Sequence, residues 1–152
     1  MQIRKASFSD MSTLIENNIK LAKESEGISL EKSTVESAVM HLLKDPTKGF
    51  YLVAEEQNEV IGQLMITFEW SDWRDATIWW IQSVYINKEN RKQGIFKKLL
   101  NTLQKLARAE HVNFFRLYVH ESNISAIAVY KHLRMKEKTY KIFETDLENL
   151  SR

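Results

Sequence analysis

A change in hydrophobic spacing near the middle of this 152-residue chain constrains its fold more than any other feature. Three strand-like segments stand in a row before the change, at residues 50–54, 60–68 and 77–86. The polar residues 56–59 between the first two predict a tight hairpin. After the change, apolar residues recur at helical spacing, at Ile95, Leu99, Leu103 and Leu106. Strands in a row that lead into a strand–helix–strand unit predict one sheet, mostly antiparallel with a parallel portion.

The flanking segments complete a mixed α+β pattern. An extended segment is predicted at residues 2–5, helices at 11–26, 30–44, 94–110 and 123–133, and further strands at 114–119 and 135–145. Neither an internal repeat nor a low-complexity linker interrupts this order. We therefore expect a single domain over residues 1–152, which is long enough to bury a core.

Composition excludes several classes of site. The chain has no cysteine, so it has no disulfide, no Cys-ligated zinc and no thiol nucleophile. Its four histidines are scattered, and we expect no metal. A formal net charge of +2 is too weak to indicate a nucleic-acid partner. No apolar run approaches the about 18 residues of a membrane span, and the first residues resemble no signal peptide, so we expect a cytoplasmic protein without a membrane partner.

The most informative stretch is residues 84–100, where a strand ends, a basic turn follows and a helix begins near Gly94. A helix N-terminus presents unpaired N–H groups and the positive end of the helix dipole, which favours phosphate. Glycine would let the backbone approach the phosphates closely. The lysines and arginine around it would add charge; they are Arg91, Lys92, Lys97 and Lys98. The alternative interpretation is an ordinary surface turn with solvated lysines.

The turn resembles the acetyl-CoA signature of the GNAT N-acetyltransferase superfamily, Arg-x-x-Gly-x-Gly/Ala. Arg91 and Gly94 match that signature, whereas Phe96 stands where the family has glycine or alanine. Residues 3–6 resemble the family's opening, and residues 121–130 resemble its second motif. The element order also resembles that of the family over nearly the whole chain. The resemblance implies a GNAT-like fold, with a central, mostly antiparallel twisted sheet and helices on both faces.

The resemblance further implies a cofactor site and a reaction. Acetyl-CoA would be the co-substrate, with its pantetheine arm slotted between two splayed strands. The residues expected to bind it are Val84, Tyr85, Ile86, Arg91, Lys92, Gln93, Gly94, Ile95, Phe96, Lys97, Asn123 and Tyr130. An amine acceptor would attack the thioester directly. Tyr130 resembles the family's tyrosine that protonates the departing thiolate. A phenol suits this role because its pKa and that of the CoA thiol lie within about two units of each other.

The second motif allows simpler interpretations. Asn123 could be only a helix N-cap, and Tyr130 only a packing aromatic. Arg134 follows the helix where the family usually has glycine, which would alter the turn without changing the chemistry.

The general base is harder to predict. Some family members use a glutamate on the strand before the turn, but residues 79–83 contain no carboxylate. The nearest candidates are Glu69 and Asp72, with Asp75 a weaker third, and each is more often a solvated loop charge.

Five aromatic residues fall within sixteen positions: Trp70, Trp73, Trp79, Trp80 and Tyr85. They are either core and sheet-face residues at alternate positions, or the wall of an acceptor pocket that receives a cation. For the pocket we predict the residues Trp70, Asp72, Trp73, Trp80 and Gln82.

We therefore expect an enzyme that acetylates a primary amine of a small molecule or a protein. A non-catalytic acetyl-CoA sensor is the alternative. The sequence leaves open the identity of the acceptor and whether the chain forms a homodimer.

Overall fold

The chain divides into two compact units, residues 1–120 and residues 121–152. The structure is a computed structural model that describes residues 1–151. Within this part of the chain, no helix is both long enough and apolar enough to cross a bilayer.

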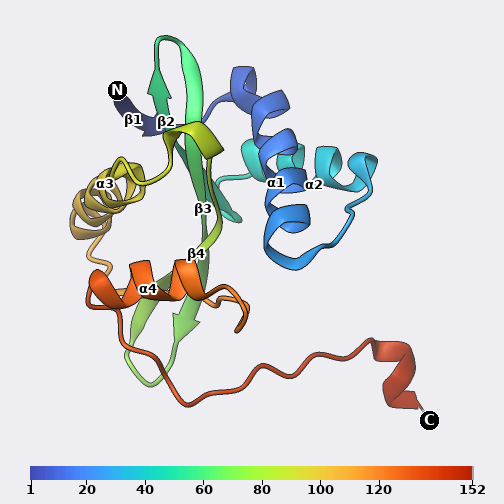
Figure 1. The fold of residues 1–152 in the computed structure, drawn as a ribbon. Helices are drawn as coiled ribbons and strands as arrows, with labels where there is room; N and C mark the ends of the chain where they lie inside the picture. Colours follow the sequence, from blue (N-terminus) through green and yellow to red (C-terminus); the bar gives the residue numbers. More distant parts are fainter. Residues whose placement is uncertain (152) are drawn as a thin grey trace. The chain divides into compact units, whose positions relative to one another are not determined.

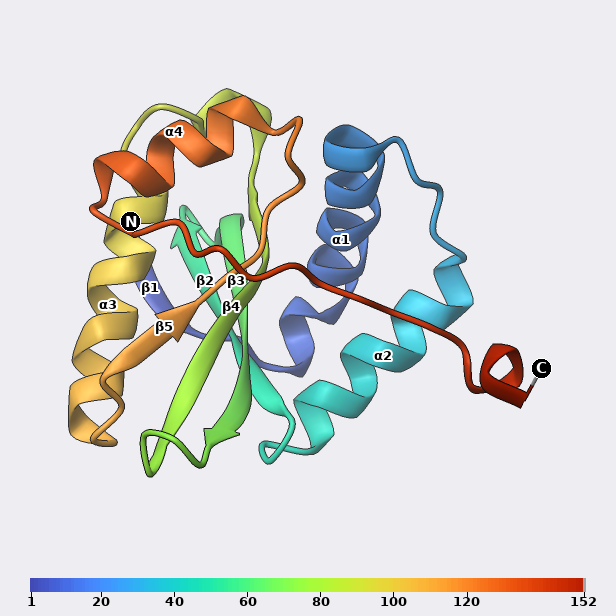
Figure 2. The ribbon, with the colours of Figure 1, turned by 90° about the horizontal axis from the view of Figure 1, so that it is seen from below.

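The first unit is built on a five-stranded sheet with the strands in sequence order, of which Figure 1 labels the first four and Figure 2 all five. The strands are β1 (Gln2–Lys5), β2 (Gly49–Glu56), β3 (Glu59–Ser71), β4 (Ala76–Ile86) and β5 (Phe114–Arg116). The first four pair antiparallel, and β4 pairs with β5 in parallel. The predicted sheet, antiparallel except at the strand–helix–strand unit, is confirmed.

Helices cover both faces of this sheet, as predicted. On one face lie α1 (Met11–Glu26) and α2 (Lys32–Lys44), and on the other lies α3 (Ile95–Ala109) (Figure 2). Two short 3₁₀ turns, η1 (Phe8–Asp10) and η2 (Lys88–Asn90), precede α1 and α3. The α1–α2 side chains that pack on Tyr51 and Val53 of β2 are Leu14, Ile15, Val35, Val39 and Leu42. The face toward α3 uses the alternate residues Leu52, Leu64 and Ile66, because successive strand residues point to opposite faces.

A buried chain of amides fixes how α1 sits on the sheet. Asn17 Nδ2 donates to Gln63 Oε1 at 3.0 Å, and Gln63 Nε2 donates to Asn18 Oδ1 at 2.9 Å. Asn18 Nδ2 in turn donates to the hydroxyl of Tyr51 at 3.0 Å. Because Gln63 and Asn17 are almost completely buried, an unpaired amide here would cost about 1–3 kcal/mol. The network therefore selects one rotation of α1 about its axis.

A two-residue turn joins β2 to β3. Gln57 and Asn58 both have positive φ, 52° and 63°, which suits the two-residue turn of the predicted β2–β3 hairpin.

Gly62 on β3 lies close to the start of α3: a Cβ there would lie 2.6 Å from Ile86 Cδ1 and 3.3 Å from Ile95 Cγ2. The missing side chain thus lets β3, β4 and α3 approach one another.

The second unit contains α4 (Ile124–His132) and a terminal 3₁₀ turn, η3 (Leu147–Ser151). Asn123 Oδ1 accepts the N–H of Ala126 at 3.1 Å, so Asn123 is an N-cap. Arg134 adopts φ +62° after the helix, and the N–H of Met135 reaches Tyr130 O at 3.0 Å. Arginine therefore makes here the left-handed turn for which glycine is usual.

The predicted strand at residues 135–145 is wrong. These residues form no regular element, and Tyr140 and Phe143 are 80% and 91% exposed. Alternating apolar residues specify a strand only where a neighbouring strand takes up the backbone hydrogen bonds, and residues 135–145 have no such ladder. The predicted strand at 114–119 is likewise shorter, ending at Arg116.

Candidate functional site

Strands β4 and β5 pair over only three residues. The ladder joins residues 78–80 to residues 114–116, and β4 continues to Ile86 without β5 beside it. Beyond Trp80, β3 is the only strand partner that β4 has in the described chain. The end of β4 therefore has a free edge on the side where β5 would have continued.

The direction of one hydrogen bond shows which backbone groups line this edge. Asn87 N–H donates to Ile61 O on β3 at 3.0 Å. Because backbone groups alternate along a strand, Ile86 and Val84 turn their N–H and C=O groups away from β3, whereas those of Tyr85 point toward it. Of the three residues predicted to bind the pantetheine arm, the backbone of Val84 and Ile86 lies on the free edge, and that of Tyr85 does not.

A bulge marks where β4 loses its neighbour. The register between β3 and β4 shifts between Gln63 and Met65, and Ser83 opposite this shift has φ +48°. A left-handed serine costs about 1 kcal/mol or more, so the surrounding ladder must hold it in place. Bulges of this kind bend a strand and increase its twist, so a bend in β4 precedes the free edge at Val84 and Ile86.

The turn after β4 forms a concave backbone surface. Lys92 and Gly94 have φ +63° and +75°, and α3 begins at Ile95. Left-handed residues that alternate with others in this way point successive N–H groups to one side and form an anion-binding nest. The first N–H groups of α3 have no acceptor within the helix and add to it. A Cβ on Gly94 would meet nothing within 4 Å, so the space beside the turn is open.

The side chains of this turn divide into two groups. Lys92, Lys97 and Lys98 are exposed and add positive charge, while Phe96 is only half-buried and Ile95 is packed into the core.

Arg91 is already engaged: its Nε donates to Ile86 O at 2.9 Å and its Nη2 to Glu24 Oε2 at 2.7 Å. Gln93 Nε2 donates to Glu89 O at 3.0 Å. We call the residues 92–97 and their backbone N–H groups the cradle.

A polar and aromatic cluster lies farther along the sheet, on the face that carries α1 and α2. Glu69 of β3 accepts two hydrogen bonds from Arg116 Nη1, at 2.8 and 2.9 Å, and one from Trp80 Nε1. The Arg116 guanidinium lies 5.8 Å from the Trp80 ring centroid. The ring centroids of Trp80 and Tyr118 are 5.9 Å apart. Gln82 Nε2 donates to Thr67 Oγ1 at 2.5 Å on the same face. Of the predicted acceptor-site residues, the structure thus brings Trp80 and Gln82 to one face, together with Glu69, a candidate general base.

The other predicted acceptor-site residues lie elsewhere. Trp70 alternates with Glu69 and therefore belongs to the opposite face, and it is 63% exposed. Asp72 and Trp73 are in the exposed β3–β4 connection, where Trp73 is 86% exposed. Trp79 is buried on the α3 face against Phe50, Phe68 and Phe115. The five clustered aromatics are divided by the sheet and do not wall one pocket.

The second unit carries Asn123 and Tyr130, seven residues apart. Burial raises the pKa of the Tyr130 phenol above its ordinary value, so the hydroxyl stays protonated at neutral pH. A protonated phenol can act as an acid.

Sequence reasoning missed Glu24, Arg116 and Tyr118. Arg116 and Tyr118 are two positions apart in the predicted strand, and this alternation next to the aromatic strand was an available signal. Glu24 had none: it is an ordinary helix-end glutamate, 61 residues from Tyr85 and 67 from Arg91.

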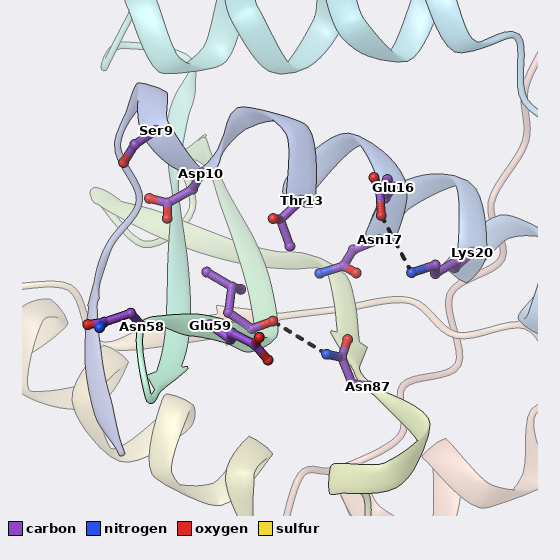
Figure 3. A pocket seen from close by; sticks show the side chains of 10 residues that line it. Ser9, Asp10, Thr13, Glu16, Asn17, Lys20, Asn58, Glu59 and Asn87 are labelled. Atoms are coloured by element: carbon purple, nitrogen blue, oxygen red, sulfur yellow. Dashed lines mark hydrogen bonds and ion pairs between the residues drawn. The ribbon is translucent and has the colours of Figure 1, made fainter.

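A separate polar cavity of about 330 Å³ lies between α1 and the β2–β3 hairpin (Figure 3). It is lined by Ser9, Asp10, Thr13, Glu16, Asn17, Lys20, Asn58, Glu59, Val60 and Asn87. Two contacts lie within its own wall: Asn87 Nδ2 donates to Val60 O at 3.4 Å, and Lys20 Nζ lies 3.7 Å from Glu16 Oε2. None of the predicted site residues lines this cavity. Within the described residues, no three His, Asp or Glu side chains are grouped so as to hold a metal ion.

Known proteins match this arrangement. A family model described as "Acetyltransferase (GNAT) family" matches residues 14–134. A structure described as a possible acetyltransferase from Clostridium difficile 630 is 41% identical, with a TM-score of 0.88 over 96% of this chain and 97% of that chain.

Two more distant structures share the fold. One is a predicted acetyltransferase from Clostridium acetobutylicum, solved with acetyl-CoA (19% identity, TM-score 0.78, 97% of each chain). The other is an aminoglycoside 6′-N-acetyltransferase from Acinetobacter haemolyticus (15% identity, TM-score 0.76, 96% of this chain and 98% of that chain).

Proposed function

Because this chain belongs to the GNAT acetyltransferase family, we propose that it transfers an acetyl group from acetyl-CoA to a primary amine. One observation carries the proposal. The free edge of β4, at Val84 and Ile86, leads directly into the cradle at residues 92–97. An extended chain that ends in a pyrophosphate would find strand-like hydrogen bonds and then an anion nest, in that order.

The residues present fit acetyl-CoA. The cradle would hold the pyrophosphate through its backbone N–H groups, with charge from Lys92 and Lys97. Phe96 leaves this intact, because its backbone N–H is retained. The N–H groups of Val84 and Ile86 would bind the pantetheine arm and polarise the thioester carbonyl. Acetyl-CoA supplies an electrophilic acyl carbon.

In the reaction, the amine nitrogen forms a bond to that carbon, the carbon–sulfur bond breaks, and the amine loses one proton. The sulfur gains a proton, for which Tyr130 is the proposed donor. The chain would hold both substrates together, which removes most of the entropic cost of a two-substrate step.

The proton of the attacking amine needs an acceptor. Both oxygens of Glu69 accept hydrogen bonds, from Arg116 and from Trp80, so each oxygen already has a donor. We infer that Glu69 orients Trp80 and Arg116 beside the acceptor, and that water takes the amine proton. Asp72, in the exposed β3–β4 connection, is a weaker candidate for the acceptor of the amine proton.

The experiment is an assay for free thiol with acetyl-CoA and a panel of amines. The panel should include aminoglycosides, because one fold relative acts on them, together with polyamines, lysine and a peptide N-terminus. We expect thiol release that depends on at least one amine. Binding of acetyl-CoA without release by any amine would favour the sensor alternative, which the engaged carboxylate of Glu69 supports. Absence of binding would overturn the proposal.

Gly94→Ala tests the cradle. A Cβ at φ +75° costs about 1–2 kcal/mol, and it would occupy the open space beside the N–H groups. We expect the affinity for acetyl-CoA, measured by calorimetry, to fall at least about tenfold, or about 1.4 kcal/mol.

Gly27→Ala is the matched control. Gly27 has φ +70° at the end of α1, and a Cβ there would also meet nothing within 4 Å, so this variant loses similar stability. Its affinity for acetyl-CoA should equal that of the wild type. Equal affinities in both variants would move the phosphate site away from Gly94.

Tyr130→Phe tests the proton donor. The change keeps the ring but removes the phenol proton, and loss of a general acid costs about 10²–10⁴-fold. We expect kcat to fall by that factor while the dissociation constant of acetyl-CoA is nearly unchanged. A kcat of Tyr130→Phe within about twofold of wild type, which corresponds to under about 0.5 kcal/mol, would exclude Tyr130 as the donor.

In the wild type the raised pKa of Tyr130 places the loss of activity at alkaline pH, as the phenol ionises.

A further inference from the structure

Three side chains from the cofactor end of the sheet converge on one carboxylate of α1. Glu24 Oε1 accepts the Tyr85 hydroxyl at 3.0 Å, and Glu24 Oε2 accepts Arg91 Nη2 at 2.7 Å. Lys88 Nζ lies 3.4 Å from Glu24 Oε1. Tyr85 is on β4, Lys88 is in η2 and Arg91 begins the turn into the cradle, so one residue contacts the whole connection.

Arg91 links this carboxylate to the backbone of β4. Its Nε donates to Ile86 O, and its guanidinium lies 5.4 Å from the Tyr85 ring centroid. The Ile86 carbonyl is on the free edge of β4, so Arg91 occupies one of the acceptors that this edge presents. With two of its three nitrogens and its face engaged, the guanidinium is aligned with the protein rather than with the cradle.

The position of Glu24 follows from the packing of α1. Asn17 is seven residues earlier, close to two helical turns, so both side chains project from the same side of the helix. Asn17 is held by Gln63 of β3, and Gln63 is paired with Tyr85 of β4. The rotation of α1 that satisfies the buried amides therefore also directs Glu24 at Tyr85.

The charges at this cluster are mutually stabilised. Burial raises the pKa of Glu24, but the hydrogen bonds from Arg91 and Tyr85 outweigh it and leave the pKa below its ordinary value. Burial and the Glu24 carboxylate together raise the pKa of Tyr85. At neutral pH, Glu24 is therefore an anion and Tyr85 a neutral donor.

We propose that Glu24 is a positioning residue for the cofactor: by pairing with Arg91 it shapes the turn into the cradle, so that Arg91 acts on the protein backbone and not on the phosphates. This inference rests on the proposed function. It assigns phosphate binding to the N–H groups and lysines of the cradle, and it gives α1 a part in cofactor binding.

The test is Glu24→Gln, which keeps the size of the side chain, removes its charge and replaces one of its two acceptor oxygens with an NH2 donor. The inference predicts that the affinity for acetyl-CoA falls about tenfold and that KM for acetyl-CoA rises, while kcat stays near wild type. A phosphate-binding Arg91 predicts the opposite sign, because its release from Glu24 would tighten binding. Unchanged or tighter binding in Glu24→Gln would overturn the inference.

Glu16→Gln is the matched control, with the same change on the same helix. Glu16 is exposed and forms an ion pair with Lys20, at 3.7 Å, far from the cradle in the chain, so the affinity of this variant for acetyl-CoA should match that of the wild type. Arg91→Lys loses the guanidinium fork and should lose about as much affinity as Glu24→Gln. The double variant should lose little more than either single variant, because the two residues act together. Additive losses would contradict the pairing.

A ligand-free measurement separates this inference from the proposed function. Amide hydrogen exchange at residues 87–94 should be faster in Glu24→Gln than in wild type and unchanged in Glu16→Gln. If wild type fails to bind acetyl-CoA, the proposed function fails, and the exchange rates still decide whether Glu24 orders the turn. Equal exchange rates in all three proteins would exclude the proposal that Glu24 orders the turn.

Discussion

The site depends on β4 keeping its hydrogen bonds to β3 after it has lost those to β5. The parallel ladder ends at Trp80 and Arg116, yet β4 continues for six residues beside β3. The bulge at Ser83 lies between the end of the β4–β5 ladder and the free edge at Val84 and Ile86. A strand paired on both sides would have no backbone groups left for a ligand, and an unpaired strand would not hold its shape. Pairing on one side provides a rigid edge at Val84 and Ile86, whose backbone groups point away from β3.

The cradle continues from this edge and relies on the same support. Its left-handed residues, Lys92 and Gly94, follow a 3₁₀ turn that would be a loose connection by itself. Contacts from Glu24 and Arg91 join this connection to α1 and to the end of β4. The buried amides of Gln63 and Asn17 set the rotation of α1 and hence the direction of Glu24. A polar network in the core thus reaches the surface where the phosphates would bind.

Much of this could be predicted from sequence, because the signals were local. Hydrophobic spacing predicted the helices and the first four strands, and the hairpin at Gln57 and Asn58 followed from its polar turn. The basic turn at Gly94 was recognised because helix starts and glycines have short signatures.

The remainder depended on contacts that spacing does not encode. Residues 135–145 alternate like a strand but have no ladder in the structure, and the aromatic run is divided by the pleat of the sheet. From sequence, Glu69 is a solvated loop carboxylate, whereas in the structure it accepts hydrogen bonds from Arg116, 47 residues away. Glu24 meets Arg91 across 67 residues for the same reason.

The central claim is that acetyl-CoA lies along the free edge of β4 and in the cradle, and backbone amide NMR during a titration with acetyl-CoA tests it most directly. The account predicts the largest shift changes at Val84, Ile86 and residues 92–97, with a smaller change at Tyr85, whose N–H faces β3. Changes centred elsewhere, such as on the polar cavity beside α1, or an absence of changes at saturating acetyl-CoA, would contradict the account.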